Sequence, residues 1–318
     1  MARKTRNTVI LAKVETTSGT DATPTGGSNA ILISNASFEY LYNNVDRDLI
    51  RGYLGASEQL AGSRFVRATF DVEISGSGTA GTAPAWGPLL QGCAMAETIS
   101  AGSRVEYNPI TASMQTLTIY YYDDGVLRKA LGCMGNVELA MGEGERPLFK
   151  FNFLGVDGGT TAASNATPTL TAWKVPLVIT DPNTGDVKLG GTYATGAITG
   201  GTAYPSRGLT FNLGNDPRQI QLLGGQRVDI NQRATTGSME LELTAAQEAT
   251  LMTDINANTL TSLSFEHGTT AGGRVLFYAP KVQRINPKLV DYEGNRLIGM
   301  DLRLTPNSGN DELLIVAL

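Results

Sequence analysis

The fold is decided by the stretch SFEYLYNNVDR, residues 37–47, because a related stretch, LTFNLGNDPR, recurs at residues 209–218. Sliding one stretch over the other places Asn44 on Asn215. Each copy then passes through a glycine-rich segment into an alternating strand. The shared order and spacing indicate an internal duplication. Two unrelated β-hairpins would also share alternation and turn residues, so this alternative stays open.

Matching strand and helix patterns follow each copy. Phe70–Ile74 and Met239–Leu243 alternate apolar and acidic residues, as half-buried strands do. Residues 84–96 and 245–255 change to helical spacing. Residues 43–64 form a charged segment that is long for a hairpin connection, which favours a binding role. Further short strands are expected at residues 116–122, 126–131, 136–141, 148–154, 262–266, 275–278, 289–292 and 297–304.

The duplication predicts four parts of the chain. These are an N-terminal arm at residues 1–36, a first module at 37–157, a linker with a small hairpin at 158–207, and a second module at 208–318. A length of 318 residues suits two domains. Polar and glycine-rich sequence predicts an irregular arm over residues 1–30. In the linker, the turn Asp181–Gly185 separates residues 173–179 from 187–189, which predicts the hairpin.

Composition excludes several classes of protein. Thirty-seven glycines and few helical patterns indicate a β-rich chain. A net charge of −5 argues against a surface that neutralises DNA, and the basic cluster Arg3–Arg6 reads as a solvated tail. Cys93 and Cys133 are expected to be free, buried thiols. We find no signal peptide and no apolar run of about 18 residues, so we expect a soluble protein that is made in a reducing cytoplasm and does not bind membranes.

Catalytic and cofactor motifs are missing. His267 is the only histidine, lies in a predicted turn, and has no nucleophile motif beside it. The sequence contains no phosphate-binding loop, dinucleotide fingerprint or zincin motif. We therefore expect no enzyme activity, no cofactor and no metal.

Charged residues alternate with apolar ones along several strands, so each strand has one polar face. The bland interpretation is that this face meets bulk water, as one face of an antiparallel sheet commonly does. The sharper one is that duplicated sheets close into a ring and the polar faces line its channel. The candidate channel-lining residues are Asp71, Glu73, Lys150, Asn152, Glu240, Glu242, Asp301 and Arg303.

With strand, long loop, strand and helix present twice, the chain resembles the major tail tube proteins of long, non-contractile-tailed phages. The resemblance covers nearly the whole chain. It is carried by Thr8–Lys13, Pro84–Leu90, Tyr120–Gly125 and Phe211–Asp216. It implies a mainly β fold of two tandem β-sandwich or half-barrel modules, each with one short flanking helix, whose inner sheets join between subunits into a β-barrel.

The resemblance also implies a structural function. Subunits would form stacked rings of a tail tube, with a negatively lined channel through which genome DNA passes into the host. Implied partners are further copies of the chain, a tape-measure protein in the lumen, tail terminator and distal tail or baseplate proteins, and double-stranded DNA in transit without sequence specificity. The implied location is the virion tail, assembled in the cytoplasm of the bacterial host.

Two modules in each chain suggest that three chains form a ring with pseudo-sixfold symmetry, with a ring of six chains as the alternative. The expected ring-stacking loops contain Asp46, Arg47, Asp48, Arg51, Arg64, Asp216, Arg218 and Arg227. Alternative functions are another tail or injection-tube component, such as a terminator or the tube of a contractile system. A capsid-decorating or sugar-binding β protein is a further alternative, with Tyr120–Tyr122 as the aromatic surface.

Overall fold

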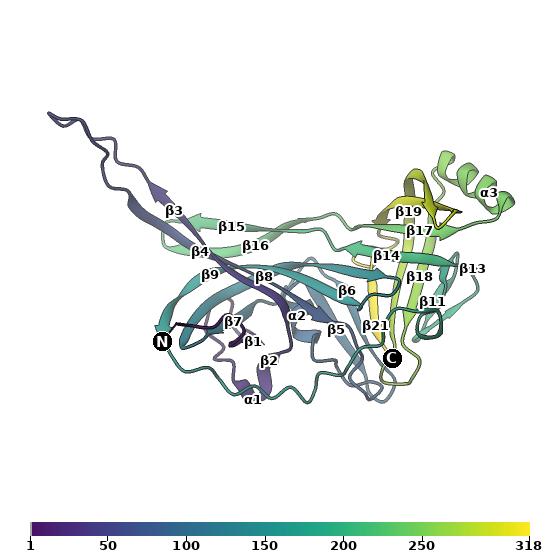
Figure 1. Ribbon diagram of the computed structural model, residues 1–318, viewed down its shortest axis with the longest axis horizontal. Coiled ribbons are helices and arrows are strands. Elements are labelled where there is room, and N and C mark those ends of the chain that lie inside the picture. The colour runs from purple at the N-terminus through teal and green to yellow at the C-terminus, as the bar shows by residue number, and fades with distance from the viewer. Residues whose placement is uncertain (1) are drawn as a thin grey trace.

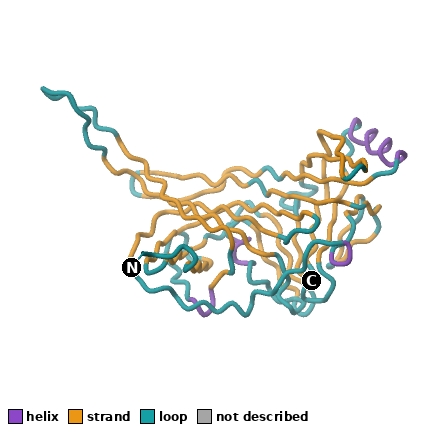
Figure 2. Tube along the Cα trace, in the orientation of Figure 1, coloured by secondary structure: helices purple, strands orange, loops and turns teal. Residues whose placement is uncertain are grey.

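The computed structural model describes residues 2–318 and is built mainly of strands (Figures 1 and 2). Strands hold 54% of the residues and helices 8%, which confirms the mainly β fold class. Large antiparallel sheets pack in layers as in a β-sandwich, and no barrel is closed within the described part of the chain.

Six strands of the first half follow a simple spatial order. Each neighbouring pair is antiparallel. In spatial order the strands are β3 (Ser34–Val45), β4 (Leu60–Glu73), β9 (Leu148–Ala162), β8 (Val126–Gly142), β7 (Leu117–Asp123) and β1 (Thr8–Val14).

The second half repeats this order with strands of its own, again all antiparallel. In spatial order the strands are β14 (Ser206–Asn212), β17 (Thr236–Glu242), β20 (Asn295–Thr305), β19 (Val275–Tyr292), β18 (Thr261–His267) and β10 (Val187–Leu189).

The register repeats as well as the order. Thr69 on β4 lies between Ser37 and Asn152, and Ser238 on β17 lies between Thr210 and Asp301 in the same arrangement. Ser37 therefore corresponds to Thr210, and the phenylalanines that follow them, Phe38 and Phe211, correspond as well. The alignment expected from Asn44 and Asn215 is thus shifted by two residues in this strand, a shift that keeps every side chain on its own face.

Two strands are longer than expected because they bend. Residues 126–131 and 136–141 belong to the single strand β8, and residues 275–278 and 289–292 to the single strand β19. The register of β8 shifts between Leu131 and Met134. Such irregularities let a strand leave one layer and continue in another. Each long strand therefore belongs to two parts of the sheet.

One hydrophobic core serves both halves. Trp86 packs against Phe149 with ring centroids 5.3 Å apart, and Phe149 in turn meets Phe277 of the second half at 6.4 Å. Trp86 precedes the short helix α2 (Gly87–Gln91), while the second half carries the longer α3 (Ala245–Asn256). Both helices were expected, although α2 is shorter than the pattern suggested.

Strands β5 (Met95–Ser100), β6 (Arg104–Pro109) and β21 (Leu314–Ala317) pair across the two halves. β5 pairs with β6, and β6 pairs with the last strand, β21. β21 also pairs with β19. Cys93 and Cys133 are free and fully buried, as expected, and burial raises the pKa of both thiols.

The N-terminal segment is more ordered than expected. It contributes β1, α1 (Gly26–Asn29) and β2 (Ala30–Ile31), and β1 pairs with β7 along its whole length. The buried carboxylate of Glu15 accepts hydrogen bonds from the hydroxyls of Thr116 and Thr118, both at 2.7 Å. The expectation of an irregular arm was therefore wrong for this part, because the continuous apolar run Ile10–Ala12 is buried on both faces of β1.

The linker also departs from expectation. Residues 173–179 form no strand, so the predicted hairpin with residues 187–189 was wrong. β10 instead pairs with β13 (Thr202–Tyr204) and β18, while β11 (Thr192–Ala194) and β12 (Ala197–Thr199) make a separate hairpin. A short helical turn, Asp181–Asn183, precedes β10.

His267 fastens this linker to the second half. It ends β18 and is 2% exposed, so its expected position in a turn was wrong. Its Nδ1 lies 2.8 Å from the Thr184 hydroxyl and its Nε2 lies 3.1 Å from the Leu177 carbonyl oxygen. Burial lowers the pKa of His267, and the bond to the Leu177 carbonyl opposes only part of that shift.

Acidification is expected to weaken the fold through this residue. A lowered folded-state pKa means that the unfolded chain binds more protons, so stability is complete above the unfolded pKa of about 6.5 and falls as the pH drops below it. His267→Gln keeps a donor and an acceptor but does not titrate. Urea unfolding between pH 7.5 and 5 should show a steeper loss for the native chain than for His267→Gln. Parallel losses would contradict this role.

Candidate assembly surface

The inner strands of both halves form one continuous sheet. Residues 138–142 of β8 pair with β14, which joins the two halves edge to edge. The resulting spatial order is β3, β4, β9, β8, β14, β17, β20 and β19. One face of this sheet covers the hydrophobic core, through residues such as Phe70, Phe151 and Met239. The opposite face is polar.

The eight residues predicted to line a channel alternate with core residues and therefore lie on this polar face. On β4 and β9, Asp71 is directly opposite Lys150, and Asn152 is opposite Thr69. On β17 and β20, Asp301 is opposite Ser238. The sheet thus brings together residues that are far apart in sequence. The complete set on this face is Asp71, Glu73, Lys150, Asn152, Glu240, Glu242, Asp301 and Arg303.

Several acids on the polar face have basic partners that the sequence did not reveal. Arg146 donates to Glu73 at 2.7 Å. Arg207 reaches Glu240 at 3.4 Å, and Lys150 reaches Glu138 at 3.7 Å. These pairs are partly exposed, so each stabilises the fold by less than about 1 kcal/mol. Arg146 lies in the loop before β9 and Arg207 near the start of β14. At such positions the alternation of apolar and polar residues does not predict which way a side chain points.

The hairpin of β3 and β4 projects beyond the body of the molecule (Figure 1). Its strands extend further than expected, so the connecting loop shrinks to residues 46–59. In this loop Arg47 and Arg51 both pair with Glu58. At the base, the Arg64 guanidinium lies over the Tyr42 ring, 5.7 Å from its centroid. The loop also contains Asp46 and Asp48.

The corresponding segment of the second half, with Asp216, Arg218 and Arg227, was expected to be a loop. It is instead a hairpin of β15 (Asn215–Leu222) and β16 (Gly225–Arg233). Its charges pair within their own strands, Arg218 with Asp216 at 2.6 Å and Arg227 with Asp229 at 2.7 Å. We name it the inner hairpin and that of β3 and β4 the outer hairpin.

The inner hairpin lies against the sheet of the first half. Val228 packs with Phe65, Met134 and Leu154 on one end of the polar face. The buried amide of Asn215 donates to the carbonyl oxygens of Cys93 and Gly135, at 2.7 and 3.0 Å. Asn215, selected in the sequence as half of a repeated pair, is therefore an anchor between the halves.

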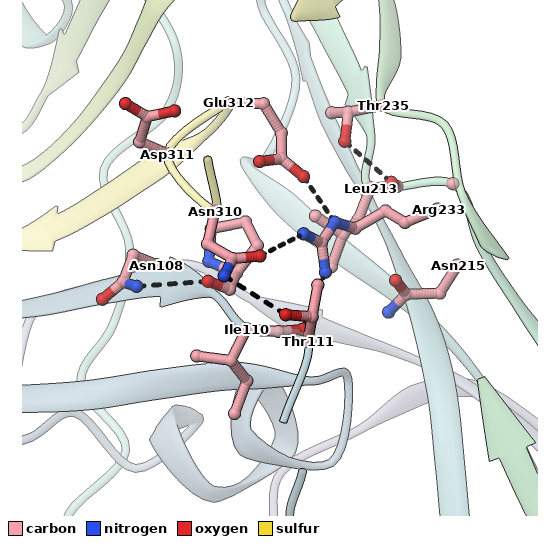
Figure 3. Close-up of polar contacts among 12 residues, drawn as sticks. Asn108, Ile110, Thr111, Leu213, Asn215, Arg233, Thr235, Asn310, Asp311 and Glu312 are labelled. Atoms are coloured by element: carbon pink, nitrogen blue, oxygen red, sulfur yellow. Dashed lines mark hydrogen bonds and ion pairs between the residues drawn. The ribbon is translucent and has the colours of Figure 1, made fainter. Parts of the chain in front are cut away.

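Arg233 ties this hairpin to two further segments (Figure 3). Its guanidinium pairs with Glu312 just ahead of β21, donates to the Ile110 carbonyl oxygen at 2.9 Å, and reaches the Asn310 side chain at 3.1 Å. The side chains of Arg233 and Glu312 are 10% and 9% exposed. The sequence gave no signal for this cluster, because its members come from three distant segments.

Arg233→Ala should lower the free energy of unfolding by about 3 kcal/mol, since it leaves the Glu312 carboxylate without this partner in a poorly solvated position. Urea unfolding measures the change. The matched control is Arg233→Met together with Glu312→Leu, which removes both charges and should recover most of the loss. An equal loss in the single and double variants would contradict this account.

Two stretches of the continuous sheet have a bare edge. Among residues 2–318, β3 pairs only with β4, and residues 288–292 of β19 pair only with β20. Apolar side chains are exposed at both places, including Leu289 at 65% and Tyr40 at 40%. Unpaired strand edges invite pairing with another chain.

Other kinds of site find little support in the described residues. No helix among them is both long and apolar enough to span a membrane. No group of three or more His, Cys, Asp or Glu side chains among them is arranged to hold a metal ion. Tyr120, part of the alternative sugar-binding surface, is 6% exposed and donates to Asp21.

Comparison with known proteins identifies the family. The family model described as phage tail tube protein matches residues 5–310, nearly the whole chain. A search of curated proteins found no match. The matched family consists of structural, non-enzymatic proteins of the virion tail that assemble with other tail components. The chain therefore belongs to the phage tail tube protein family.

Proposed function

We propose that copies of this chain form stacked rings whose joined inner sheets enclose the channel of a non-contractile tail tube. The observation that carries the proposal is the continuous eight-stranded sheet. It has a core on one face, charges on the other and a bare edge at each end. A sheet of this kind removes its edges by joining further copies of itself until the ring closes.

The internal repeat supports a ring of three chains. Each chain supplies two modules of four inner strands, which we place at residues 37–157 and 208–318, between an N-terminal arm and a linker. Three chains then supply six modules with pseudo-sixfold symmetry. Rings of six chains would double the circumference. Heterologous contacts along the axis would stack such rings into a filament.

The polar face would form the channel wall. Five of its eight predicted residues are acids (Asp71, Glu73, Glu240, Glu242 and Asp301) and two are bases. A wall of net negative charge repels the phosphates of double-stranded DNA, so the genome passes without sticking. Before DNA enters, the same lumen would hold a tape-measure protein.

The projecting outer hairpin favours contacts between neighbouring subunits or rings. Arg47 and Arg51, held beside Glu58, place charge at its far end. We propose that the tube is assembled in the bacterial cytoplasm and is bounded by a terminator at one end and by distal tail or baseplate proteins at the other.

Electron microscopy of the purified full-length chain tests the proposal. Hollow rods are expected, with native mass spectrometry of the ring giving three chains. Closed particles or dispersed monomers under all assembly conditions would overturn the function. Rings of six chains would overturn the trimer and leave the tube.

Shortening the outer hairpin should block polymerisation. Residues 46–59 are replaced by Asn-Gly, a two-residue turn that can close the hairpin beyond Val45 and Leu60. The expected product is a folded, soluble chain that makes no rods, seen by circular dichroism and negative-stain imaging. A matched control deletes Thr259 from the exposed loop between α3 and β18, residues 257–260. Normal rods from the hairpin variant would count against a role in assembly.

Reversing charge on the polar face should make the tube bind DNA. Glu240→Lys with Glu242→Lys is expected to give rods that retain short duplex DNA in a sedimentation assay at low salt, because added bases attract phosphates. Asp181→Lys with Asp186→Lys, on the exposed loop ahead of β10, is the control of equal charge. Equal retention by both variants would exclude the polar face from the channel.

A further inference from the structure

The junction between the two halves provides a template for the junction between two copies. Within the chain, Leu139 of β8 lies opposite Phe211 of β14, and Glu138 lies opposite Asn212. Leu139 and Phe211 are 3% and 1% exposed, so the strand pairing also closes the core beneath it.

The free end of β19 occupies the place that the end of β8 occupies in the first half. Leu139 pairs with Phe149 on β9, and Leu289 pairs with Ile298 on β20. The next strands repeat the register, because Phe149 lies opposite Val72 and Ile298 lies opposite Leu241. Leu289 therefore corresponds to Leu139, and the residue before it, Lys288, corresponds to Glu138.

The other bare edge, β3, corresponds to β14. Phe38 lies opposite Ala68 on β4, and Phe211 lies opposite Gly237 on β17, at the same position relative to the rest of each module. Glu39, which follows Phe38, therefore corresponds to Asn212. β14 is covered by β8, whereas β3 has no strand on its outer side within the described chain.

We propose that β19 of one copy pairs antiparallel with β3 of the next copy in the register of the internal junction. The residue pairs across the new junction are Lys288–Glu39, Leu289–Phe38 and Val290–Ser37. This inference rests on the ring proposed above. It adds which two edges meet and at which residues.

The chemistry of the two edges fits this register. Lys288 and Glu39 fall on the polar face with opposite charges directly across the junction. Within residues 2–318 the ion pair of each is long, with Lys288 at 3.9 Å from Asp301 and Glu39 at 3.8 Å from Arg67. On the core face, Leu289 would be covered as Leu139 is.

A groove beside β20 fits the outer hairpin of the next copy. It encloses about 960 Å³ and is lined in part by Met114, Ile230 and Arg303. Arg303 on β20 lies opposite Thr236, and Leu154 on β9 lies opposite Arg67 at the same register position of the first half. Arg303 therefore corresponds to Leu154.

In the first half the inner hairpin covers that position, because Val228 packs on Leu154. The outer hairpin has exposed apolar side chains, Val45 and Leu60 among them, for the same place on the next copy. Arg303 then belongs to this contact rather than to the open channel wall.

Crosslinking of the full chain tests the register. Lys288→Cys with Glu39→Cys places two thiols directly opposite each other across the junction, about 5 Å apart at Cβ, close enough for a disulfide to form on mild oxidation. The control, Lys288→Cys with Leu41→Cys, moves one thiol two residues along the same face. Cys93 and Cys133 are fully buried and remain in every variant.

The in-register pair is expected to give covalent chains on a non-reducing denaturing gel, ending at three chains for a closed trimer. Linking by the offset pair and not by the in-register pair, in rods seen by microscopy, would overturn the register and leave the tube function standing. Absence of rings and rods in the unmutated chain would overturn both.

Charge reversal provides a second readout. Lys288→Glu and Glu39→Lys should each raise the concentration needed for assembly by about fivefold or more, and the double variant should return it toward the native value. Within one chain, Lys288→Glu places like charge beside Asp301 and Glu39→Lys places like charge beside Arg67. Recovery of assembly in the double variant can therefore come only from a contact between copies. Additive losses in the double variant would overturn the pairing.

Discussion

The structure depends on backbone hydrogen bonding at the edge between β8 and β14. A strand that is buried on one face and bare along its edge leaves polar backbone groups without partners, and a neighbouring strand is the most direct way to satisfy them. Where β8 bends away from β7, β14 takes its place. This change of partner joins two similar modules into one sheet, whose polar face runs across both halves.

The halves are similar in topology but not independent in energy. Phe149 and Phe277 belong to one core, β6 and β21 pair across the halves, and the inner hairpin is anchored by Asn215 and Arg233 to residues of the first half. Removal of either half would expose an apolar surface that the other now covers. We propose that the boundaries suggested by the duplication are places where the chain crosses between modules, rather than lines along which it separates.

Local patterns predicted what depends on local physics. Alternation in Phe70–Glu73 and Met239–Glu242 gave the strands and their polar face, and helical spacing after Thr244 gave α3, whose capping box joins Thr244 and Gln247. The resemblance to phage tail tube proteins, confirmed by comparison, supplied the fold class. Bends within β8 and β19, the ordered β1 and the inner hairpin were missed. A bulge or a pairing between distant segments leaves no periodic trace in a single sequence.

Covalent duplication has a consequence for how a polymer of this chain would be controlled. Every second junction around the proposed ring lies within one polypeptide, so it forms when the chain folds and cannot dissociate. Only the junctions between chains can be regulated, and the residues at them are free to diverge from those at the internal junction. The internal junction has Glu138 opposite Asn212. Its counterpart between copies would place Lys288 opposite Glu39, two charged side chains that stay hydrated on a free subunit and attract each other only when two copies meet.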